Sequence, residues 1–126
     1  MKMVIVRGLP GSGKSTIAKQ LIGNEVHIKH FEADMYFMSN GAYIFDHTRL
    51  KEVHQQCQAD VKSALLIGYD VVVSNTFVKK WEIEPYLLIA KDIGCDVEVI
   101  VATGEYSNVH GVPKEVIERM KSNWES

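Results

Sequence analysis

The segment from Gly8 to Ser15 constrains the fold of this chain more than any other feature. It reads Gly-Leu-Pro-Gly-Ser-Gly-Lys-Ser, which has the spacing G-x-x-x-x-G-K-S of a phosphate-binding loop. Such a loop needs a strand before it and a helix after it. The apolar run at 3–6 and the helical spacing of apolar residues at 17, 18 and 21 supply both. The order of strand, glycine turn and helix therefore predicts a nucleotide-binding α/β fold.

Each fixed residue of this loop has a predicted task in holding a nucleoside triphosphate. The glycines let the backbone curl so that successive N–H groups point at the phosphates, and the following helix adds the positive end of its dipole. Lys14 is expected to reach the β- and γ-phosphates, and the Ser15 hydroxyl to ligate Mg²⁺. The predicted nucleotide-binding residues of this segment are Gly8, Pro10, Gly11, Ser12, Gly13, Lys14, Ser15 and Thr16.

The rest of the chain alternates between strand and helix patterns. Continuous apolar strands separated by helices indicate a parallel sheet that is covered on both faces. We therefore predict one domain over residues 1–126, an α/β three-layer P-loop NTPase fold with a mostly parallel sheet of about four strands. Strands are expected at about 2–7, 26–32, 70–74 and 96–101, and helices at about 14–22, 47–67, 79–93 and 113–124, with a turn at 39–41.

Composition limits the partners of the chain only weakly. The 14 Lys and Arg residues are scattered and the net charge is −2, which disfavours an extended surface for binding nucleic acid. A nucleic-acid substrate that is bound only at one terminus remains compatible with this charge. No apolar run approaches the ~20 residues that span a bilayer, and the first predicted strand leaves no room for a signal peptide. Cys57 and Cys95 have no metal-ligand spacing. We expect a cytoplasmic protein with free thiols and no membrane partner.

Asp34 is the carboxylate with the clearest candidate role. Ligands of parallel sheets bind beyond the carboxyl ends of the strands, and Asp34 follows the strand expected at 26–32. There it could accept the proton of an acceptor hydroxyl, and together with Ser15 it forms the predicted Mg²⁺ site. The alternative interpretation is a helix N-cap or a solvated acid. Glu32, two residues earlier and on the same side of an extended chain, is the second candidate for the base.

Other polar and aromatic residues near the expected cleft have two interpretations each. Residues 74–76, Ser-Asn-Thr, either hydrogen-bond a metal-bound water without supplying charge or form a plain turn. Tyr43, Phe45 and Trp81 either stack a ring or pack in a core. His110, in the last loop, is predicted to contact the nucleotide, with a structural role as the alternative.

Several segments in the same order resemble a known family. Gly8–Thr16 matches its phosphate loop and 33–36 its base-bearing segment, and further matches lie at 40–46, 53–54, 75–76, 81–82 and 110–113. The chain resembles P-loop kinase-like ATPases of the AAA type that include the 5′-kinase domain of phage polynucleotide kinase, and small phage and bacterial ATP-binding proteins. The resemblance covers essentially the whole chain. It implies phosphotransfer with ATP and Mg²⁺, with Lys14 and Ser15 on the phosphates and metal and Asp34 as the base.

Three departures from the polynucleotide kinase pattern bear on that activity. Phe37 stands where the kinase has an arginine that grips the acceptor phosphate, and Asn75 stands where it has a carboxylate. Only residues 103–109 separate the last predicted strand from 110–113, so the arginine-bearing lid is nearly absent. Such an arginine contributes a factor of ~10³–10⁵ in rate. Arg119, on the last predicted helix, is the substitute that the sequence offers.

The leading hypothesis is a kinase that moves the γ-phosphate of ATP to a hydroxyl, with a polynucleotide 5′-hydroxyl or a nucleoside-like compound as candidate acceptors. Its predicted catalytic residues are Lys14, Asp34 and Arg119. One alternative is a non-catalytic or slowly hydrolysing ATP-binding module that acts through a partner, motivated by Asn75 and the missing lid arginine. Another is a small-metabolite kinase that resembles gluconate or shikimate kinases. The sequence leaves the acceptor and the oligomeric state unassigned.

Overall fold

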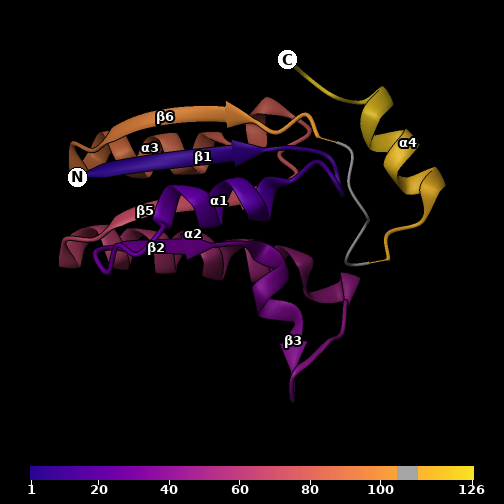
Figure 1. Ribbon diagram of the computed structural model, residues 1–126, viewed down its shortest axis with the longest axis horizontal. Helices are drawn as coiled ribbons and strands as arrows, with labels where there is room; N and C mark the ends of the chain where they lie inside the picture. The colour runs from indigo at the N-terminus through magenta and orange to yellow at the C-terminus, as the bar shows by residue number, and fades with distance from the viewer. Residues whose placement is uncertain (105–110) are drawn as a thin grey trace.

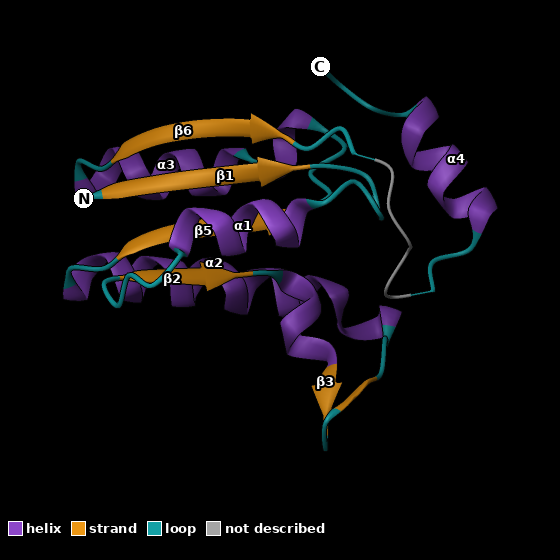
Figure 2. Ribbon diagram, viewed as in Figure 1, coloured by secondary structure: helices purple, strands orange, loops and turns teal. Residues whose placement is uncertain are grey.

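Four parallel strands of mainly apolar residues form the centre of the fold (Figure 1). The computed structural model describes residues 1–104 and 111–126, with the side chain of Ser39 left out. The strands are β1 (Lys2–Arg7), β2 (Ile28–Phe31), β5 (Asp70–Asn75) and β6 (Asp96–Val101). Their order is β2-β5-β1-β6, and Figure 2 shows them as arrows that run in one direction. The predicted α/β fold with a parallel sheet of about four strands is confirmed.

Helices cover both faces of this sheet because alternate side chains of a strand point in opposite directions. The helices that cover the sheet are α1 (Lys14–Ile22), α2 (Leu50–Ile67) and α3 (Glu84–Ile93). Val4 and Val6 of β1 pack toward α1, whereas Met3 and Ile5 pack toward α2 and α3, so one strand contributes to two cores. No helix in the described residues combines the length and the apolar character needed to cross a membrane.

Two of the predicted helices begin later than the sequence pattern indicates because a 3₁₀ turn precedes each. The turn η2 (His47–Arg49) leads into α2, and the Asp46 carboxylate accepts a hydrogen bond from Thr48 N at 3.0 Å. The turn η3 (Lys80–Glu82) leads into α3, and Glu82 Oε2 accepts a bond of 2.7 Å from the backbone N–H three residues earlier. Local side-chain bonds of this kind favour a turn over a continuous helix. The other predicted boundaries lie within two residues of those observed.

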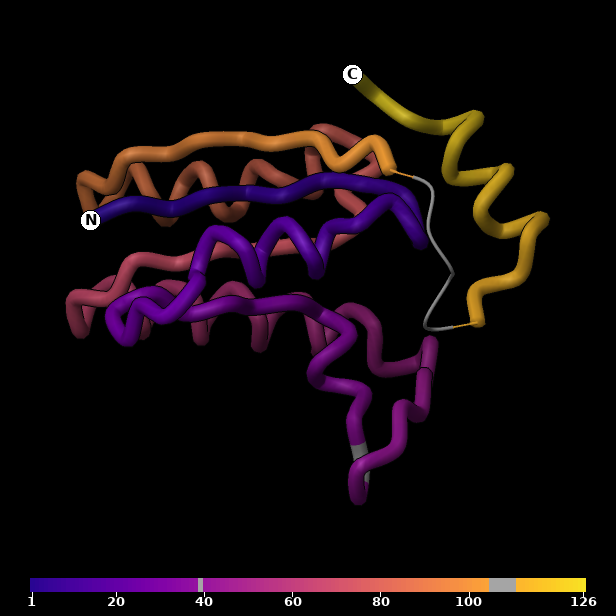
Figure 3. Tube along the Cα trace, viewed as in Figure 1, coloured from indigo at the N-terminus to yellow at the C-terminus, as the bar shows by residue number. Residues whose placement is uncertain are grey.

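A short hairpin that the sequence pattern did not predict projects from the sheet between β2 and α2 (Figure 3). The 3₁₀ helix η1 (Ala33–Phe37) leads into β3 (Met38–Ser39), which pairs with β4 (Ala42–Tyr43). Asn40 and Gly41 have φ angles of 50° and 80°, the left-handed conformations that a tight two-residue turn requires. The predicted turn at 39–41 is therefore the tip of a hairpin.

The C-terminal segment is tied to β1 by one buried arginine. Arg7 is 4% exposed, and its Nε and Nη2 donate hydrogen bonds to the Phe77 carbonyl at 3.0 and 2.8 Å. Nη2 also donates to the Glu125 carbonyl at 2.6 Å, and the guanidinium lies 4.4 Å from the centre of the Trp124 ring. Arg7 thereby fixes the end of α4 (Lys114–Ser122), which stands beyond the carboxyl edge of the sheet (Figure 1).

The replacement Arg7→Met should lower the free energy of unfolding by about 2 kcal/mol, because it removes charged hydrogen bonds to buried carbonyls. Urea denaturation measures this change, and amide hydrogen exchange should rise across residues 114–126. Arg49→Met is the matched control, since the Arg49 side chain is 47% exposed and lies 3.8 Å from Glu52. Its effect should stay within about 0.5 kcal/mol. Unchanged exchange in Arg7→Met would show that Arg7 does not hold the C-terminal segment.

Candidate functional site

The register of the sheet brings the ends of three strands together at one edge. Arg7 of β1 lies beside Asn75 of β5, so the phosphate-binding loop and the turn after β5 leave the sheet side by side. Gly8 N donates a hydrogen bond to the Thr76 carbonyl at 3.3 Å across this edge. A cavity of about 680 Å³ opens here. The phosphate-binding loop and the strand ends contribute Pro10, Gly11, Gly13, Lys14, Ser15, Thr16, Glu32, Asp34, Ser74, Asn75 and Thr76 to its lining.

The phosphate-binding loop has the backbone that its sequence predicts. Gly11 and Gly13 have φ angles of 79° and 92°, and α1 begins directly after Gly13. Gly8 is required for space rather than for its conformation, because a Cβ there would lie 2.2 Å from Ser12 Oγ. Ser12 Oγ is buried and has no hydrogen-bond partner among the described residues. A phosphate oxygen is the kind of acceptor that would satisfy such a hydroxyl and the free N–H groups of the helix start.

Lys14 projects into the cavity from the first turn of α1. Its Nζ donates a hydrogen bond to the Leu9 carbonyl at 3.2 Å. Burial lowers the pKa of Lys14 below its ordinary value, and the Glu32 and Asp34 carboxylates oppose this shift. A triphosphate would add further negative charge beside the ammonium group, so its binding should raise the pKa again. The position suits the predicted contact with the β- and γ-phosphates.

Glu32 occupies the centre of a buried hydrogen-bond network below the loop. It is 7% exposed, and its Oε2 accepts hydrogen bonds from Ser15 Oγ at 3.1 Å and Ser74 Oγ at 3.2 Å. His30 Nε2 lies 2.6 Å from Ser74 Oγ and 3.4 Å from Glu32 Oε2. Burial lowers the pKa of His30, although the Glu32 carboxylate opposes that change. The Glu32 carboxylate is therefore hydrogen-bonded to the Ser15 hydroxyl, which is predicted to ligate Mg²⁺.

Asp34, in η1, also lines the cavity. The Tyr43 hydroxyl donates a hydrogen bond to Asp34 Oδ1 at 3.0 Å. Burial and then the Asp34 carboxylate raise the pKa of Tyr43, so this hydroxyl keeps its proton and orients the carboxylate. The chain turns into η1 at Ala33, whose N–H donates to Asn75 Oδ1 at 2.8 Å. Glu32 and Asp34 are therefore not on one side of an extended chain, as the sequence analysis assumed, and they face different partners.

The residues present fit a nucleotide with Mg²⁺. Carboxylate and hydroxyl oxygens, which Mg²⁺ prefers, are supplied by Ser15, Glu32 and Asp34 at the cavity. Asn75 Nδ2 is buried without a hydrogen-bond partner in the described part of the chain, and it is available to a phosphate or metal-bound water. Ser15 and Glu32 are the residues that would hold the metal side of such a complex. The sequence predicted Ser15 and Asp34 for the metal and gave Glu32 only as the second candidate for the base, because periodicity alone does not show the contact of Glu32 with Ser15.

The remaining predicted residues divide between the cavity and its surroundings. Tyr43 and Phe45 line the cavity, whereas Trp81 is 67% exposed and lies outside its described lining. Arg119 is exposed on α4 and is also outside that lining, although Met120 of the same helix belongs to it. His110 lies outside the residues that the structure describes.

A second cavity of about 330 Å³ adjoins the first on the side of α1 and the end of β6. Gly13 and Thr16 line both cavities, and the Gly104 N–H donates to the Ser12 carbonyl at 3.0 Å beside the second one. The phosphate-binding loop therefore separates two spaces. The second is lined by Ser12, Gly13, Thr16, Ile17, Gln20, Val101, Thr103 and Gly104.

Comparisons with known proteins agree with this geometry. Residues 3–104 match a family model described as an AAA domain. Human NEDD4-binding protein 2 is 32% identical over 133 residues, a match that spans 98% of this chain but 8% of the human protein. Among solved structures, the Pnkp1/Rnl/Hen1 RNA repair complex matches with a TM-score of 0.74 and 21% identity, over 97% of this chain and 43% of that one. Chaetomium thermophilum Kti12 in complex with ADP-AlF3 matches with a TM-score of 0.72 and 18% identity, over 98% of this chain and 80% of the Kti12 chain.

The replacement Gly8→Ala should weaken ATP binding about tenfold or more, which corresponds to about 1.4 kcal/mol, because the new Cβ displaces Ser12 and Lys14. Calorimetric titration with ATP and Mg²⁺ measures the affinity. The double variant Gly8→Ala, Ser12→Ala removes the closest clash and should recover part of the loss. Ser63→Ala, an exposed change on α2, should leave the affinity unchanged. Normal ATP affinity in Gly8→Ala would contradict the steric role of this glycine.

Proposed function

The chain belongs to this AAA-domain family of P-loop kinase-like proteins, and from that premise we propose that it transfers the γ-phosphate of ATP to a hydroxyl group. The observation that carries the proposal is the position of Asp34. Its carboxylate, oriented by Tyr43, lines the same cavity as Lys14 and Ser15. In-line transfer needs a base for the acceptor hydroxyl and a cation for the phosphates within one cavity. A polynucleotide 5′-hydroxyl, a nucleoside-like compound and a small metabolite are the candidate acceptors.

In the proposed reaction Asp34 takes the proton of the acceptor hydroxyl as its oxygen attacks the γ-phosphorus. The bond between the γ-phosphorus and the β–γ bridging oxygen breaks, and ADP leaves with that oxygen. Lys14 stabilises the charge that develops on the phosphate oxygens. Mg²⁺, when bound, neutralises further phosphate charge. Arg119 remains a proposed catalytic residue, as the substitute for the lid arginine. It is exposed on α4 and is not part of the described cavity lining.

We assign the metal to Ser15 and Glu32 and the role of the base to Asp34. The sequence had suggested Asp34 both as the base and as a metal ligand. Glu32 supplies the carboxylate that residue 75 lacks, because it reaches Ser15 from the neighbouring strand end at 3.1 Å. Asp34 accepts a hydrogen bond from the Tyr43 hydroxyl, whereas Glu32 accepts from Ser15 and Ser74. Two carboxylates that accept from different hydroxyls are able to serve two separate tasks.

The second candidate function is an ATP-binding module that hydrolyses slowly or not at all and acts through a partner. It is favoured by the charges around the cavity, since Lys14 is the single lysine or arginine in the described lining. Transfer enzymes of this class depend on additional cationic groups for much of their rate. Both candidates require nucleotide binding, and they differ in whether an acceptor is phosphorylated.

The replacement Asp34→Asn should lower phosphate transfer by about 10²–10⁴-fold, because the amide cannot take the acceptor proton. Transfer of radiolabelled γ-phosphate to a panel of hydroxyl compounds measures the rate, and calorimetry should show ATP affinity within about threefold of the unmodified protein. Asp92→Asn, an exposed change on α3, should leave both quantities unchanged. Tight ATP binding with no labelled acceptor in the unmodified protein would support the binding module instead.

The replacement Glu32→Gln should reduce the dependence of ATP binding on Mg²⁺. The measured quantity is the ratio of the ATP dissociation constants in EDTA and in Mg²⁺, and it should fall about tenfold or more when the carboxylate is lost. Glu82→Gln is the matched control, since Glu82 lines the same cavity but accepts its hydrogen bond from Lys79 N. An unchanged ratio in Glu32→Gln, in a variant that unfolds at the same urea concentration, would remove Glu32 from the metal site.

A further inference from the structure

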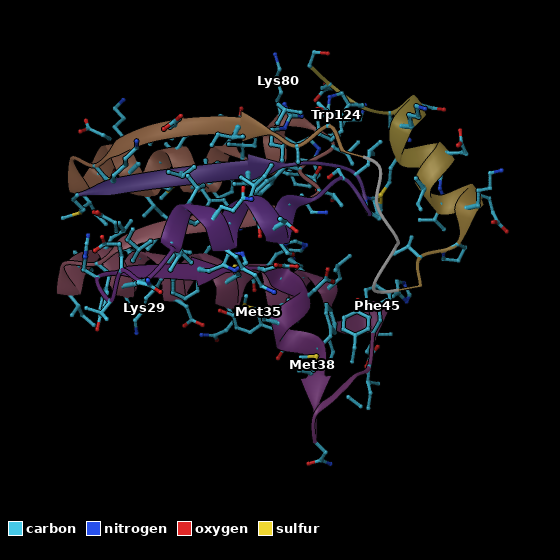
Figure 4. The ribbon with its side chains drawn as sticks, in the orientation of Figure 1. Lys29, Met35, Met38, Phe45, Lys80 and Trp124 are labelled. Carbon is cyan, nitrogen blue, oxygen red and sulfur yellow. The ribbon has the colours of Figure 1, made fainter. Side chains whose placement is uncertain are left out.

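Beyond Asp34, one wall of the large cavity is apolar and aromatic. Phe37 and Phe45 have ring centres 5.0 Å apart, and Tyr43 packs against Phe37 at 6.4 Å in an edge arrangement. Phe45 is 52% exposed, and Figure 4 shows its ring turned from the segment after β4 toward η1. The wall is completed by Leu50 on one side and by Val116 and Met120 of α4 on the other.

This wall lies on the acceptor side of the phosphates. Lys14 and Asp34 mark the end of the cavity where a γ-phosphate would lie, and the aromatic residues follow Asp34 along the hairpin. The second cavity lies beside the helix end of the phosphate-binding loop, where Gly13 and Thr16 line both cavities, and it extends to Gln20 and Thr103, which are outside the first one. A triphosphate that runs along the loop would therefore place its nucleoside toward the second cavity. The aromatic wall is left for the molecule that receives the phosphate.

The charge of the lining disfavours an anionic acceptor. The described lining contains the carboxylates of Glu32, Asp34 and Glu82 and one lysine, Lys14, which the triphosphate would occupy. Two like charges 4 Å apart repel by about 4 kcal/mol at the effective dielectric constant of a protein surface. An acceptor phosphate beside ATP would meet this repulsion, and the described lining has no second lysine or arginine to offset it.

We propose that the acceptor is an uncharged hydroxyl compound with a flat ring, of the nucleoside class, whose ring stacks on the Phe45 and Tyr43 wall. This inference rests on the proposed phosphotransfer and names its substrate class. Stacking of a base on an aromatic side chain contributes about 1–3 kcal/mol without any charge. A sugar hydroxyl of the stacked nucleoside would then face Asp34, and His54 on the same wall offers a further hydrogen-bonding group. Single-stranded nucleic acid is the competing acceptor, and it carries a phosphate next to the terminal nucleoside.

The test compares each ribonucleoside with its own 3′-monophosphate and with a 5′-hydroxyl oligonucleotide. The nucleoside and its 3′-monophosphate share the base, the sugar and the 5′-hydroxyl and differ only in the added phosphate, whereas the oligonucleotide also carries further nucleotides. With radiolabelled ATP and Mg²⁺, kcat/KM for the best nucleoside should exceed that for its 3′-monophosphate by about tenfold or more. Equal or better transfer to the 3′-monophosphate or the oligonucleotide would overturn the proposed acceptor class while supporting phosphotransfer.

A lysine introduced into the aromatic wall tests whether the acceptor binds there. Phe45→Lys should lower the preference for the nucleoside over its 3′-monophosphate about tenfold or more, because the ammonium group removes stacking and offsets the acceptor phosphate. Ile44→Lys is the matched control, since Ile44 is 58% exposed on the adjacent position and outside the cavity lining. Its preference should equal that of the unmodified protein. The same preference in both lysine variants would overturn the assignment of the wall to the acceptor.

Binding measured separately from transfer distinguishes the two proposals. The full chain is saturated with a non-hydrolysable ATP analogue and Mg²⁺ and titrated by calorimetry with the nucleoside and its 3′-monophosphate. Selective binding of the nucleoside without transfer from ATP would leave the aromatic wall as a nucleoside-binding site and overturn both the proposed phosphotransfer and the role of the nucleoside as acceptor. Transfer to some acceptor without selective nucleoside binding would overturn the acceptor class alone.

Discussion

The parallel pairing of β5 between β1 and β2 is the constraint on which the site depends. Its register sets Arg7 beside Asn75 and Phe31 beside Val73, so three chain segments leave the sheet at one edge. The hydrogen bond from Ala33 N to Asn75 Oδ1 continues this pairing past the end of β2. A shift of β2 by one residue would exchange the faces of all its side chains and remove the Glu32 carboxylate from Ser15. The backbone ladder thus determines which carboxylate reaches the phosphate-binding loop.

Two charged side chains are buried at this edge, and their partners indicate different tasks. Arg7 donates to the carbonyls of Phe77 and Glu125, which are parts of the fixed backbone, so its role is structural. Glu32 accepts from the hydroxyls of Ser15 and Ser74, which rotate freely enough to exchange partners. An unpaired buried charge costs several kcal/mol, so both sets of partners are needed for folding. Of the two, only the hydrogen bonds of Glu32 with the Ser15 and Ser74 hydroxyls can be rearranged when a ligand binds.

The sequence predicted the parts of the fold and site that depend on local pattern. The continuous apolar run at 71–73 and the glycines from Gly8 to Gly13 indicate a strand and a phosphate-binding loop without reference to the rest of the chain. The hairpin after η1 was missed because strands of two residues have no periodicity, and its order comes from contacts such as Phe37 with Phe45. Asp34 was found from its place after a strand. The contacts of Glu32 with Ser15 and of Arg7 with Glu125 join residues distant in sequence, and no local pattern contains them.

The anchoring of α4 by Arg7 determines which side chains face the cavity from this helix, and these side chains are apolar rather than cationic. Because Arg7 holds Trp124 and Glu125, the preceding helix keeps Val116 and Met120 over the cavity, where they cover the site with apolar surface. A less polar surrounding strengthens each remaining electrostatic interaction, so Lys14 would act on bound phosphates more strongly than it would in solvent. The same apolar cover supplies no cation to a second anion. If the proposed phosphotransfer takes place here, such a site would favour an acceptor that brings a hydroxyl and a ring but no charge of its own.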